Sequence, residues 1–417
     1  MKELLINAFK STVYKVLSAV LKFGQILLIT NLYGAENFGA YTFAISVFLF
    51  INSIFRFGFD VYIHKKVASI FIEKGKGQSQ QFFVKIVLIP IVVLALVSVL
   101  VKFSLVTFDV VALKLNFLSS IILYSSLYAF MWLFAYYNRG IEKGKTSVFI
   151  LEIVFPLINI LGILLFSFLD LNINIILIHS YGLTVFICLL IFIGLEKLDY
   201  SLFGKYFSKI KYYSLIETKN AFPYLLISMS SMLLAWVDFY VISFFESDGN
   251  LGIYSASTKL AQFMLFPASA IAIFFSNKLV EFYKNNDHKS VVTFLKKITI
   301  ILFVVSSLLF VLINLFSSTI LNLFGKEFKQ GNIVLLILTL AYLINASVGA
   351  FETVLLMSSH KRYLFNLNLI TVLLNIIFNI PLVFLYGIEG AAFGTLISIA
   401  TNRIMQYYFI RNKVLKI

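Results

Sequence analysis

The chain has 417 residues, of which 60% are hydrophobic, 17% aromatic and 13% charged, and its formal net charge is +15. Soluble globular proteins are typically about 45–50% apolar and about 25% charged, so this composition excludes a soluble protein and indicates one that has lipid as its solvent. The single cysteine, Cys188, excludes a disulfide framework within the chain.

Apolar runs of about 20 residues, the length that crosses a bilayer as a helix, recur along the whole chain. They predict an all-α integral membrane protein with about twelve transmembrane helices. The longest connection, 196–218, divides them into two groups of six, so we predict an N-terminal bundle, 1–205, and a C-terminal bundle, 206–417. The predicted spans are 11–32, 38–63, 82–106, 112–138, 146–169, 172–195, 218–245, 253–275, 293–316, 332–357, 362–386 and 388–410.

Lysine and arginine residues concentrate in the loops on one side of these spans. If the N-terminus is on the inner side, the outer loops carry just Lys102, Lys114, Lys326 and Lys329. The positive-inside rule therefore predicts that both termini are cytoplasmic. The net positive charge is a topology signal that predicts contacts with membrane lipids, and the sequence contains no nucleic-acid-binding module.

A short motif occurs twice, as "NFGAYTFA" at 37–44 and "NLGIYSAS" at 250–257. The asparagine, glycine and tyrosine residues stand at matching positions, and each copy opens the second span of its group of six. This similarity indicates a duplicated six-helix unit in parallel orientation, an arrangement that recurs in transporters.

The first span carries polar residues at helical spacing, which form one stripe along the helix. Lys22 lies about 16 Å from either end of this span, too deep for its ammonium group to reach the membrane surface easily. We therefore expect the stripe to line a cavity, although Lys15 can reach the inner interface. The stripe consists of Ser11, Lys15, Ser18, Lys22 and Gln25.

Arg56 lies in the second span, about 10 Å from its inner end. Asp60 follows four residues later on the same helical face, where the two side chains can pair. One interpretation is an intrahelical ion pair close to the interface. The other is a cation on the inner part of a cavity.

Asp238 and Lys259 lie at the same depth in the seventh and eighth predicted spans, which are antiparallel neighbours. We expect a buried ion pair between them, which either fixes the register of the helices or is broken by substrate or by a proton. Glu152, Glu352 and Arg403 lie closer to the inner face, where a structural role is the leading interpretation.

Several motifs of soluble proteins do not apply. The segment "GIEKGKT" at 140–146 resembles a phosphate-binding loop, but it is one residue short and follows no strand. No cluster of cysteine and histidine residues indicates a metal site, and no serine, histidine and aspartate set indicates catalysis. The sequence therefore predicts neither a cofactor nor an enzyme.

Three segments carry a family resemblance: "TNLYGAENFGAYTFA", "LGIYSASTKLAQF" and "YGIEGAAFGTLIS". They resemble bacterial polysaccharide-export flippases of the multidrug/oligosaccharidyl-lipid/polysaccharide exporter superfamily. The resemblance implies two six-helix bundles around a central cavity that opens alternately to the two faces of the bacterial inner membrane. It also implies a cargo, an undecaprenyl-pyrophosphate-linked oligosaccharide repeat unit of O-antigen or capsule.

The resemblance also implies roles for the charged residues within the spans. Cations on the cavity wall would bind the pyrophosphate through charge-assisted hydrogen bonds, and coupling to an ion gradient would involve buried acids. Partners implied are the lipid-linked oligosaccharide, membrane lipids and other polysaccharide-assembly proteins. The candidate substrate-binding residues are Lys15, Lys22, Gln25, Arg56, Lys259 and Arg403, and the candidates for ion coupling or ion pairing are Asp238, Glu352 and Asp60.

Three other functions compete with the flippase. A multidrug cation antiporter of the same superfamily should have an acidic cavity, and Lys22 argues against it. A membrane polysaccharide polymerase or ligase should carry a large outer loop, whereas the longest outer loop here is 317–331. A scaffold role is the third alternative.

Overall fold

The computed structural model of the chain describes residues 2–107, 112–168, 173–196, 201–207, 210–268, 288–357 and 361–414. Within these ranges all regular structure is helical. Seven described helices are long and apolar enough to cross a membrane, or eight if a bent pair, Tyr213–Ser230 and Met232–Phe245, forms one span. The predicted all-α, multi-pass membrane architecture is confirmed, and the count of about twelve spans stays a prediction.

The chain forms two compact units, which we call unit 1 and unit 2. Unit 1 comprises Met1–Gln25 and Ala44–Met232, and unit 2 comprises Ile26–Phe43 and Leu233–Ile417. The first helix, α1 (Lys2–Arg56), therefore contributes to both units, because its middle belongs to unit 2 and its two ends to unit 1.

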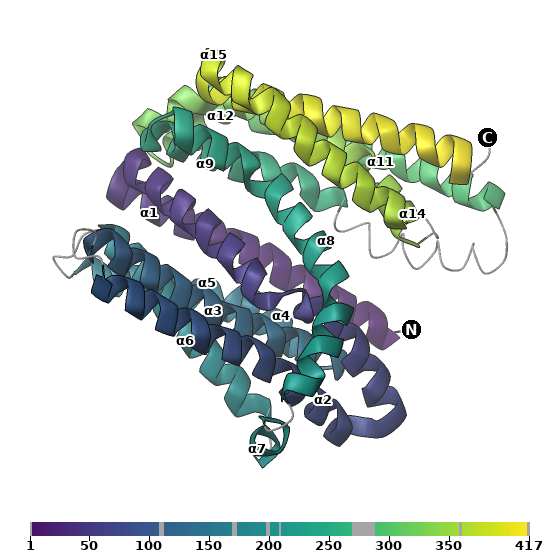
Figure 1. Ribbon diagram of the computed structural model, residues 1–417. Helices are drawn as coiled ribbons and strands as arrows, with labels where there is room; N and C mark the ends of the chain where they lie inside the picture. The colour runs from purple at the N-terminus through teal and green to yellow at the C-terminus, as the bar shows by residue number, and fades with distance from the viewer. Residues whose placement is uncertain are drawn as a thin grey trace. The chain divides into compact units, whose positions relative to one another are not determined.

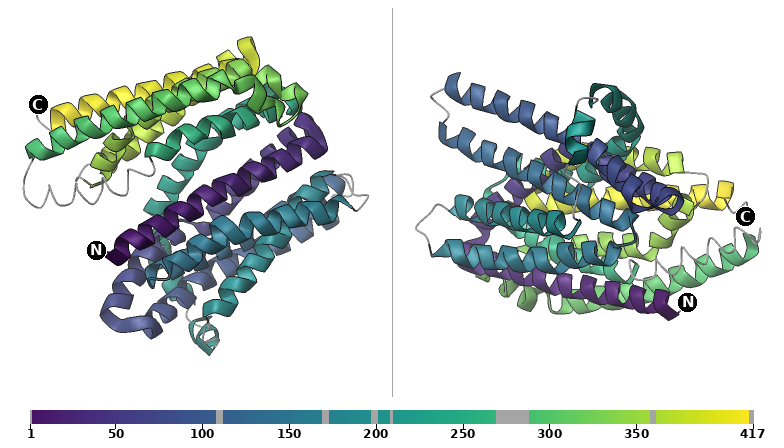
Figure 2. Two further views of the ribbon diagram at one scale, coloured as in Figure 1. Left: turned by 180° about the vertical axis from the view of Figure 1, so that it is seen from behind. Right: turned by 90° about the horizontal axis from the view of Figure 1, so that it is seen from below.

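Unit 1 is built around a large aromatic and aliphatic core. The rings of Phe83 and Tyr137 stack with centroids 4.4 Å apart, and both side chains are fully buried together with Phe192. Helix α6 packs against both α3 and α5 (Figure 2). Beside the ends of α1, the helices of this unit are α2 (Phe59–Thr107), α3 (Ala112–Gly140), α4 (Gly144–Phe149), η2 (Ile150–Val154), α5 (Phe155–Ser167), α6 (Ile173–Glu196) and α7 (Ser201–Phe207).

Helix α8 (Ile210–Phe245) begins in unit 1 and ends in unit 2. In unit 2, α13 is central, because it packs against α9, α11 and α15. The remaining elements are α9 (Asp248–Ala261), η3 (Gln262–Leu265), α11 (His288–Leu315), α12 (Ser317–Asn322), η4 (Lys326–Gly331), α13 (Asn332–Ser347), α14 (Gly349–Met357), α15 (Lys361–Phe409) and η5 (Ile410–Val414).

Glycines with positive φ break three long helical elements into two helices each: Gly34 in α1, Gly75 in α2 (φ 77°) and Gly387 in α15. Gly34 in α1 (φ 77°) and Gly387 in α15 (φ 59°) have left-handed backbone conformations, which are strained for residues that carry a Cβ atom. Elements α1 and α15 accordingly each consist of two antiparallel arms (Figure 1). The turns at Gly34 and Gly387 separate the predicted spans 11–32 and 38–63, and likewise 362–386 and 388–410.

The predicted span 38–63 is interrupted, because Phe57 (φ 48°) and Gly58 (φ 72°) break the helix between α1 and α2. Gly58 also permits a close approach of α8, since a Cβ atom placed there would lie 2.3 Å from the amide nitrogen of Leu225. Sequence analysis did not detect this break because the apolar run continues through it.

Candidate functional site

The polar stripe of α1 is in contact with polar groups of unit 1. Nζ of Lys22 lies 2.7 Å from Oε2 of Glu152, and the hydroxyl of Ser18 donates a hydrogen bond of 2.6 Å to the same oxygen. Nε2 of Gln25 donates to Oδ1 of Asn159 at 2.7 Å. Three of the five predicted stripe residues therefore share one row of polar contacts. The side chains of Ser11 and Lys15 lie outside the described residues.

Glu152 is presented to α1 by a π-helical turn, η2, between α4 and α5. Pro156 lacks an amide hydrogen, so it cannot donate the regular helical hydrogen bond to the carbonyl of Glu152 four residues earlier. This missing bond explains why the helix widens here. Turns of this type are frequent at functional sites.

Lys22 is half exposed although it lies deep in its helix. Its side chain is 53% exposed and that of Glu152 31%, whereas Ser18 is buried. A charged side chain facing lipid in mid-membrane costs at least about 2.5 kcal/mol. We therefore expect the half-exposed side chain to face water or a polar ligand, and a cavity role for Lys22 stays a prediction. An ammonium group has three donors, and the pair with Glu152 uses one of them.

Gln25 joins a buried, uncharged chain of hydrogen bonds across α1, α5 and α6. Nδ2 of Asn159 donates to Oγ1 of Thr184 at 3.3 Å, and Thr184 in turn donates to the carbonyl of Ser180 at 2.8 Å. Asn159 is 1% exposed. The chain fixes Gln25 three residues beyond Lys22, on the same side of α1.

Arg56 is held by two neighbours. Its Nη1 atom donates to Oδ2 of Asp60 at 2.7 Å, and its guanidinium carbon lies 5.5 Å from the centroid of the Trp132 ring. The ion pair that the sequence indicates is thus present, but it bridges the helix break at Phe57 and Gly58 instead of lying within one helix. A cavity role for Arg56 stays a prediction.

In unit 2, Asp238 is buried among neutral donors. Oδ2 accepts hydrogen bonds from the hydroxyls of Tyr254 (2.8 Å) and Thr395 (2.6 Å), and Oδ1 accepts one from Nδ2 of Asn379 (2.8 Å). The amide of Asn379 also donates to Asn375 at 2.7 Å. Groups from α8, α9 and both arms of α15 therefore meet at this carboxylate.

The ion pair expected between Asp238 and Lys259 is not among the contacts of the described residues. Nζ of Lys259 lies 5.4 Å from the centroid of the Trp236 ring. Tyr254 is the residue of α9 that faces Asp238, and a position five residues later is rotated by about 140° around a helix. Equal depth in the membrane therefore did not put Lys259 on the side of α9 that faces the carboxylate.

Arg403 lies in a polar cluster with Glu352. Its Nη2 atom is 3.3 Å from Oε2 of Glu352, while Nε donates to Oδ1 of Asn345 at 2.9 Å and Nη1 to Oε1 of Gln406 at 2.8 Å. The side chain of Arg403 is 12% exposed and that of Glu352 44%. Arg403 therefore has partners on α13, on α14 and in its own helix, and a substrate-binding role for it stays a prediction.

The two copies of the repeated motif meet inside unit 2. A Cβ atom placed on Gly39 would lie 1.7 Å from the carbonyl oxygen of Asp248, and one placed on Gly252 would lie 2.1 Å from that of Ala35. The hydroxyls of Thr42 and Ser255, which are 213 positions apart in the chain, lie 3.1 Å from each other.

We call this contact between the two copies, at Gly39 and Gly252, the glycine crossing. It has local twofold symmetry. Gly39 and Gly252 are also 213 positions apart, as are Ala35 and Asp248, so each copy makes the same backbone contact with the other. Glu327 additionally accepts a hydrogen bond of 2.5 Å from the amide of Ala35 next to the Gly34 turn. Small residues permit such close approach of two membrane helices.

Residues 4–277, well over half of the chain, match the family model described as polysaccharide biosynthesis protein. The chain belongs to this family. It is 24% identical to the capsular polysaccharide biosynthesis protein CapF of Staphylococcus aureus over 96% of this chain and 97% of that protein. It is 23% identical to the probable low-salt glycan biosynthesis flippase Agl15 of Haloferax volcanii over 45% of this chain and 40% of that protein.

Solved structures with a similar fold include a flippase and a multidrug resistance transporter. The lipid II flippase MurJ in an inward closed conformation has a TM-score of 0.74 at 17% identity, covering 97% of this chain and 87% of that chain. An inward-facing multidrug resistance transporter of the MATE family, a member of the MOP superfamily, has a TM-score of 0.73 at 12% identity, covering 96% and 95%. At these identities the similarity establishes the fold.

Two buried carboxylates of unit 1, those of Glu217 and Glu196, were not predicted from the sequence. Glu217 accepts hydrogen bonds of 2.6 Å from both the hydroxyl of Tyr62 and Nζ of Lys85. Glu196 accepts one of 2.9 Å from Nζ of Lys143. Both acids lie in or next to the basic connection 196–218. Charged residues are common in such a connection, so no feature of the sequence indicates that these two are buried.

Proposed function

We propose that the chain is a flippase that moves lipid-linked oligosaccharide across the bacterial inner membrane, with both termini in the cytoplasm. Its cargo would be undecaprenyl-pyrophosphate-linked repeat units of a surface polysaccharide, moved from the cytoplasmic to the outer leaflet without chemical change. The half-exposed side chain of Lys22, far from either end of its predicted span, carries this proposal. The names of the relatives, a capsular polysaccharide protein and a glycan flippase, support it.

The pair of Lys22 and Glu152 suits a ligand that must bind and then leave. Pyrophosphate oxygens would accept charge-assisted hydrogen bonds from the donors of Lys22 that Glu152 does not use. Glu152 neutralises the lysine when cargo is absent and competes with the pyrophosphate when it is present. Gln25, held by Asn159, would offer a neutral contact one helical turn away.

The glycine crossing supports transport by alternating access. Its two helices touch through backbone at Gly39 and Gly252 and through one hydroxyl pair, Thr42 and Ser255. Such a contact has no long side chains to disentangle, so it can separate and re-form at little cost. We propose that this crossing closes the outer end of the pathway and parts when the pathway opens outward.

Asp238 is our candidate for ion coupling. Asp60 is compensated by Arg56, and Glu352 is paired with Arg403. The hydrogen bonds that described residues give Asp238 all come from neutral groups. Because burying a charge without a counter-charge is costly, a proton or a small cation would stabilise this carboxylate, and its arrival or departure would bias the conformation of unit 2.

The test is transbilayer movement of an undecaprenyl-pyrophosphate oligosaccharide in liposomes that contain the purified chain. We expect movement with the unaltered protein, its loss with Lys22→Ala, and its retention with Lys65→Ala, a lysine outside the predicted cavity. Movement that persists in Lys22→Ala would remove Lys22 from the mechanism and keep the flippase. Absence of movement in the unaltered protein, under imposed proton and sodium gradients, would contradict the flippase and favour the antiporter.

A further inference from the structure

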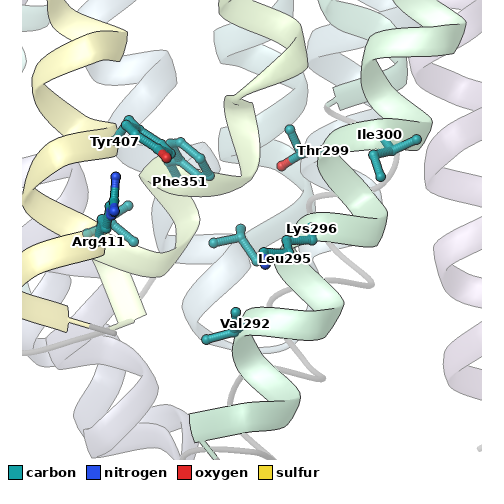
Figure 3. A pocket seen from close by; sticks show the side chains of 9 residues that line it. Val292, Leu295, Lys296, Thr299, Ile300, Phe351, Tyr407 and Arg411 are labelled. Atoms are coloured by element: carbon teal, nitrogen blue, oxygen red, sulfur yellow. The ribbon is translucent and has the colours of Figure 1, made fainter. Parts of the chain in front are cut away.

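Unit 2 contains a cavity of about 510 Å³ at the ends of α11, α14 and α15. Figure 3 shows its lining, with α11 on one side and the end of α15 with η5 on the other. Cavities that hold small ligands typically measure about 300–1,000 Å³. Leu295, Phe351 and Ile410 form a buried apolar wall of the cavity.

Two cations line this cavity from facing sides, Lys296 on α11 and Arg411 on η5 (Figure 3), and both are exposed. Two hydroxyl groups add polar character to the same lining. The oxygen of Thr299 is shielded from solvent and has no hydrogen-bond partner among the described residues. The ring of Tyr407 stacks on Phe351 with centroids 6.1 Å apart. An anion with several oxygens could accept hydrogen bonds from Lys296, from Arg411 and from the hydroxyl of Thr299.

On the α11 side the cavity continues into an apolar surface. Ile300 lines the cavity and is 63% exposed, and it begins a stripe of exposed side chains along α11 that includes Val304 and Leu308. Only 17% of the apolar window of α11 is buried, the lowest share among the candidate spans of the described residues. We therefore expect the stripe to face lipid chains, with Lys296 near the end of the candidate span Ser290–Leu315.

We propose that this cavity binds one anionic phospholipid of the leaflet at the basic ends of the helices. Its phosphate would lie between Lys296 and Arg411, and an acyl chain would follow Ile300 along α11. Basic pockets between membrane helices on the cytoplasmic side are known places for acidic lipid headgroups. Lys22 is not among the residues that line this cavity, and the proposal does not depend on the transport function proposed above.

The test uses native mass spectrometry of the full chain, titrated in detergent with phosphatidylglycerol, phosphatidylcholine, undecaprenyl phosphate or inorganic phosphate. We expect one tight phosphatidylglycerol per chain, with binding about fivefold weaker for Lys296→Gln and about 25-fold weaker for Lys296→Gln with Arg411→Gln. The matched control is Lys297→Gln, an equal charge change on an exposed neighbour outside the cavity lining.

A second variant separates the cavity from general attraction to positive charge. Val292→Trp fills the cavity and keeps both cations, so it should also reduce phosphatidylglycerol binding, while the elution volume of the purified protein reports intact folding. Equal losses in Lys296→Gln and Lys297→Gln would overturn the proposal. So would unchanged binding in Val292→Trp, or binding of phosphatidylcholine, undecaprenyl phosphate or inorganic phosphate as tight as that of phosphatidylglycerol.

Discussion

Gly39→Ala is the sharpest test of the glycine crossing. The added Cβ atom would lie 1.7 Å from the carbonyl oxygen of Asp248, whereas nonbonded heavy atoms need roughly 3.5 Å. The two backbones must therefore separate by roughly 1.5–2 Å, which takes the 3.1 Å contact between Thr42 and Ser255 beyond hydrogen-bond range. Overpacking of this kind typically costs about 1–3 kcal/mol. The equilibrium should shift toward the separated state by a factor of about 5–150.

The assay uses a pair of cysteines at the crossing, Thr42→Cys with Ser255→Cys, in a chain whose native Cys188 is replaced by alanine. Oxidation should join the two sulfurs rapidly when Gly39 is present, because their oxygen counterparts lie 3.1 Å apart. With Gly39→Ala, cross-linking should slow, and labelling of the cysteines by a membrane-impermeant thiol reagent from the outer side should rise.

Gly24→Ala is the matched control. It lies in the same helix, but a Cβ atom there would meet no other atom within 4 Å. It should therefore change neither cross-linking nor labelling. If Gly39→Ala cross-links as fast as the parent, or if Gly24→Ala slows the reaction equally, the close backbone contact does not control the crossing and the reasoning is refuted.

Three further predictions concern the polar contacts. Glu152→Gln should leave Lys22 without its counter-charge, tightening the binding of an undecaprenyl-pyrophosphate ligand about tenfold and slowing its release, seen as a lower transport rate; weaker binding would contradict the proposed competition. Pro156→Ala should restore a regular helix at η2 and withdraw Glu152 from α1, so it should reduce transport without lowering the melting temperature; unaltered transport would show that the π turn is dispensable. Asp238→Asn should remove the dependence of transport on an imposed ion gradient, and a gradient response equal to that of the parent would exclude Asp238 from coupling.

Sequence reasoning succeeded where one helix held all the information. Ser18, Lys22 and Gln25 are spaced by three or four residues, so their common side follows from helical geometry, and the depth of Lys22 follows from the length of the apolar run. The structure adds partners from α4–α5, which no pattern within α1 could identify. The sequence identifies Glu152 as a charged residue within a predicted span, but it does not show the π-helical turn that presents Glu152 to α1. That turn depends on the missing amide hydrogen of Pro156.

Other features were unpredictable because they depend on contacts between distant segments. The sequence predicts equal depths for Asp238 and Lys259, but Tyr254 is the residue of α9 that contacts Asp238, and Lys259 lies against the Trp236 ring. The repeated motif indicated a duplication through Gly39 and Gly252, but not that the two copies touch each other. The break at Phe57 and Gly58 lies in a continuous apolar run, and α8 packs closely against it.

Helix α1 carries both the candidate cargo-binding lysine and one side of the glycine crossing, and it passes from unit 1 to unit 2 between Gln25 and Ile26. Lys22 and the Gly34 turn are joined by about 18 Å of uninterrupted helix, which behaves as a stiff rod. A one-residue insertion in that rod would turn its ends by about 100° relative to each other. The number of residues between Lys22 and Gly34 is therefore constrained more tightly than the residue types on the surface of this segment. New cargo preferences should accordingly evolve more readily on the helices that face α1 than by insertions or deletions within α1.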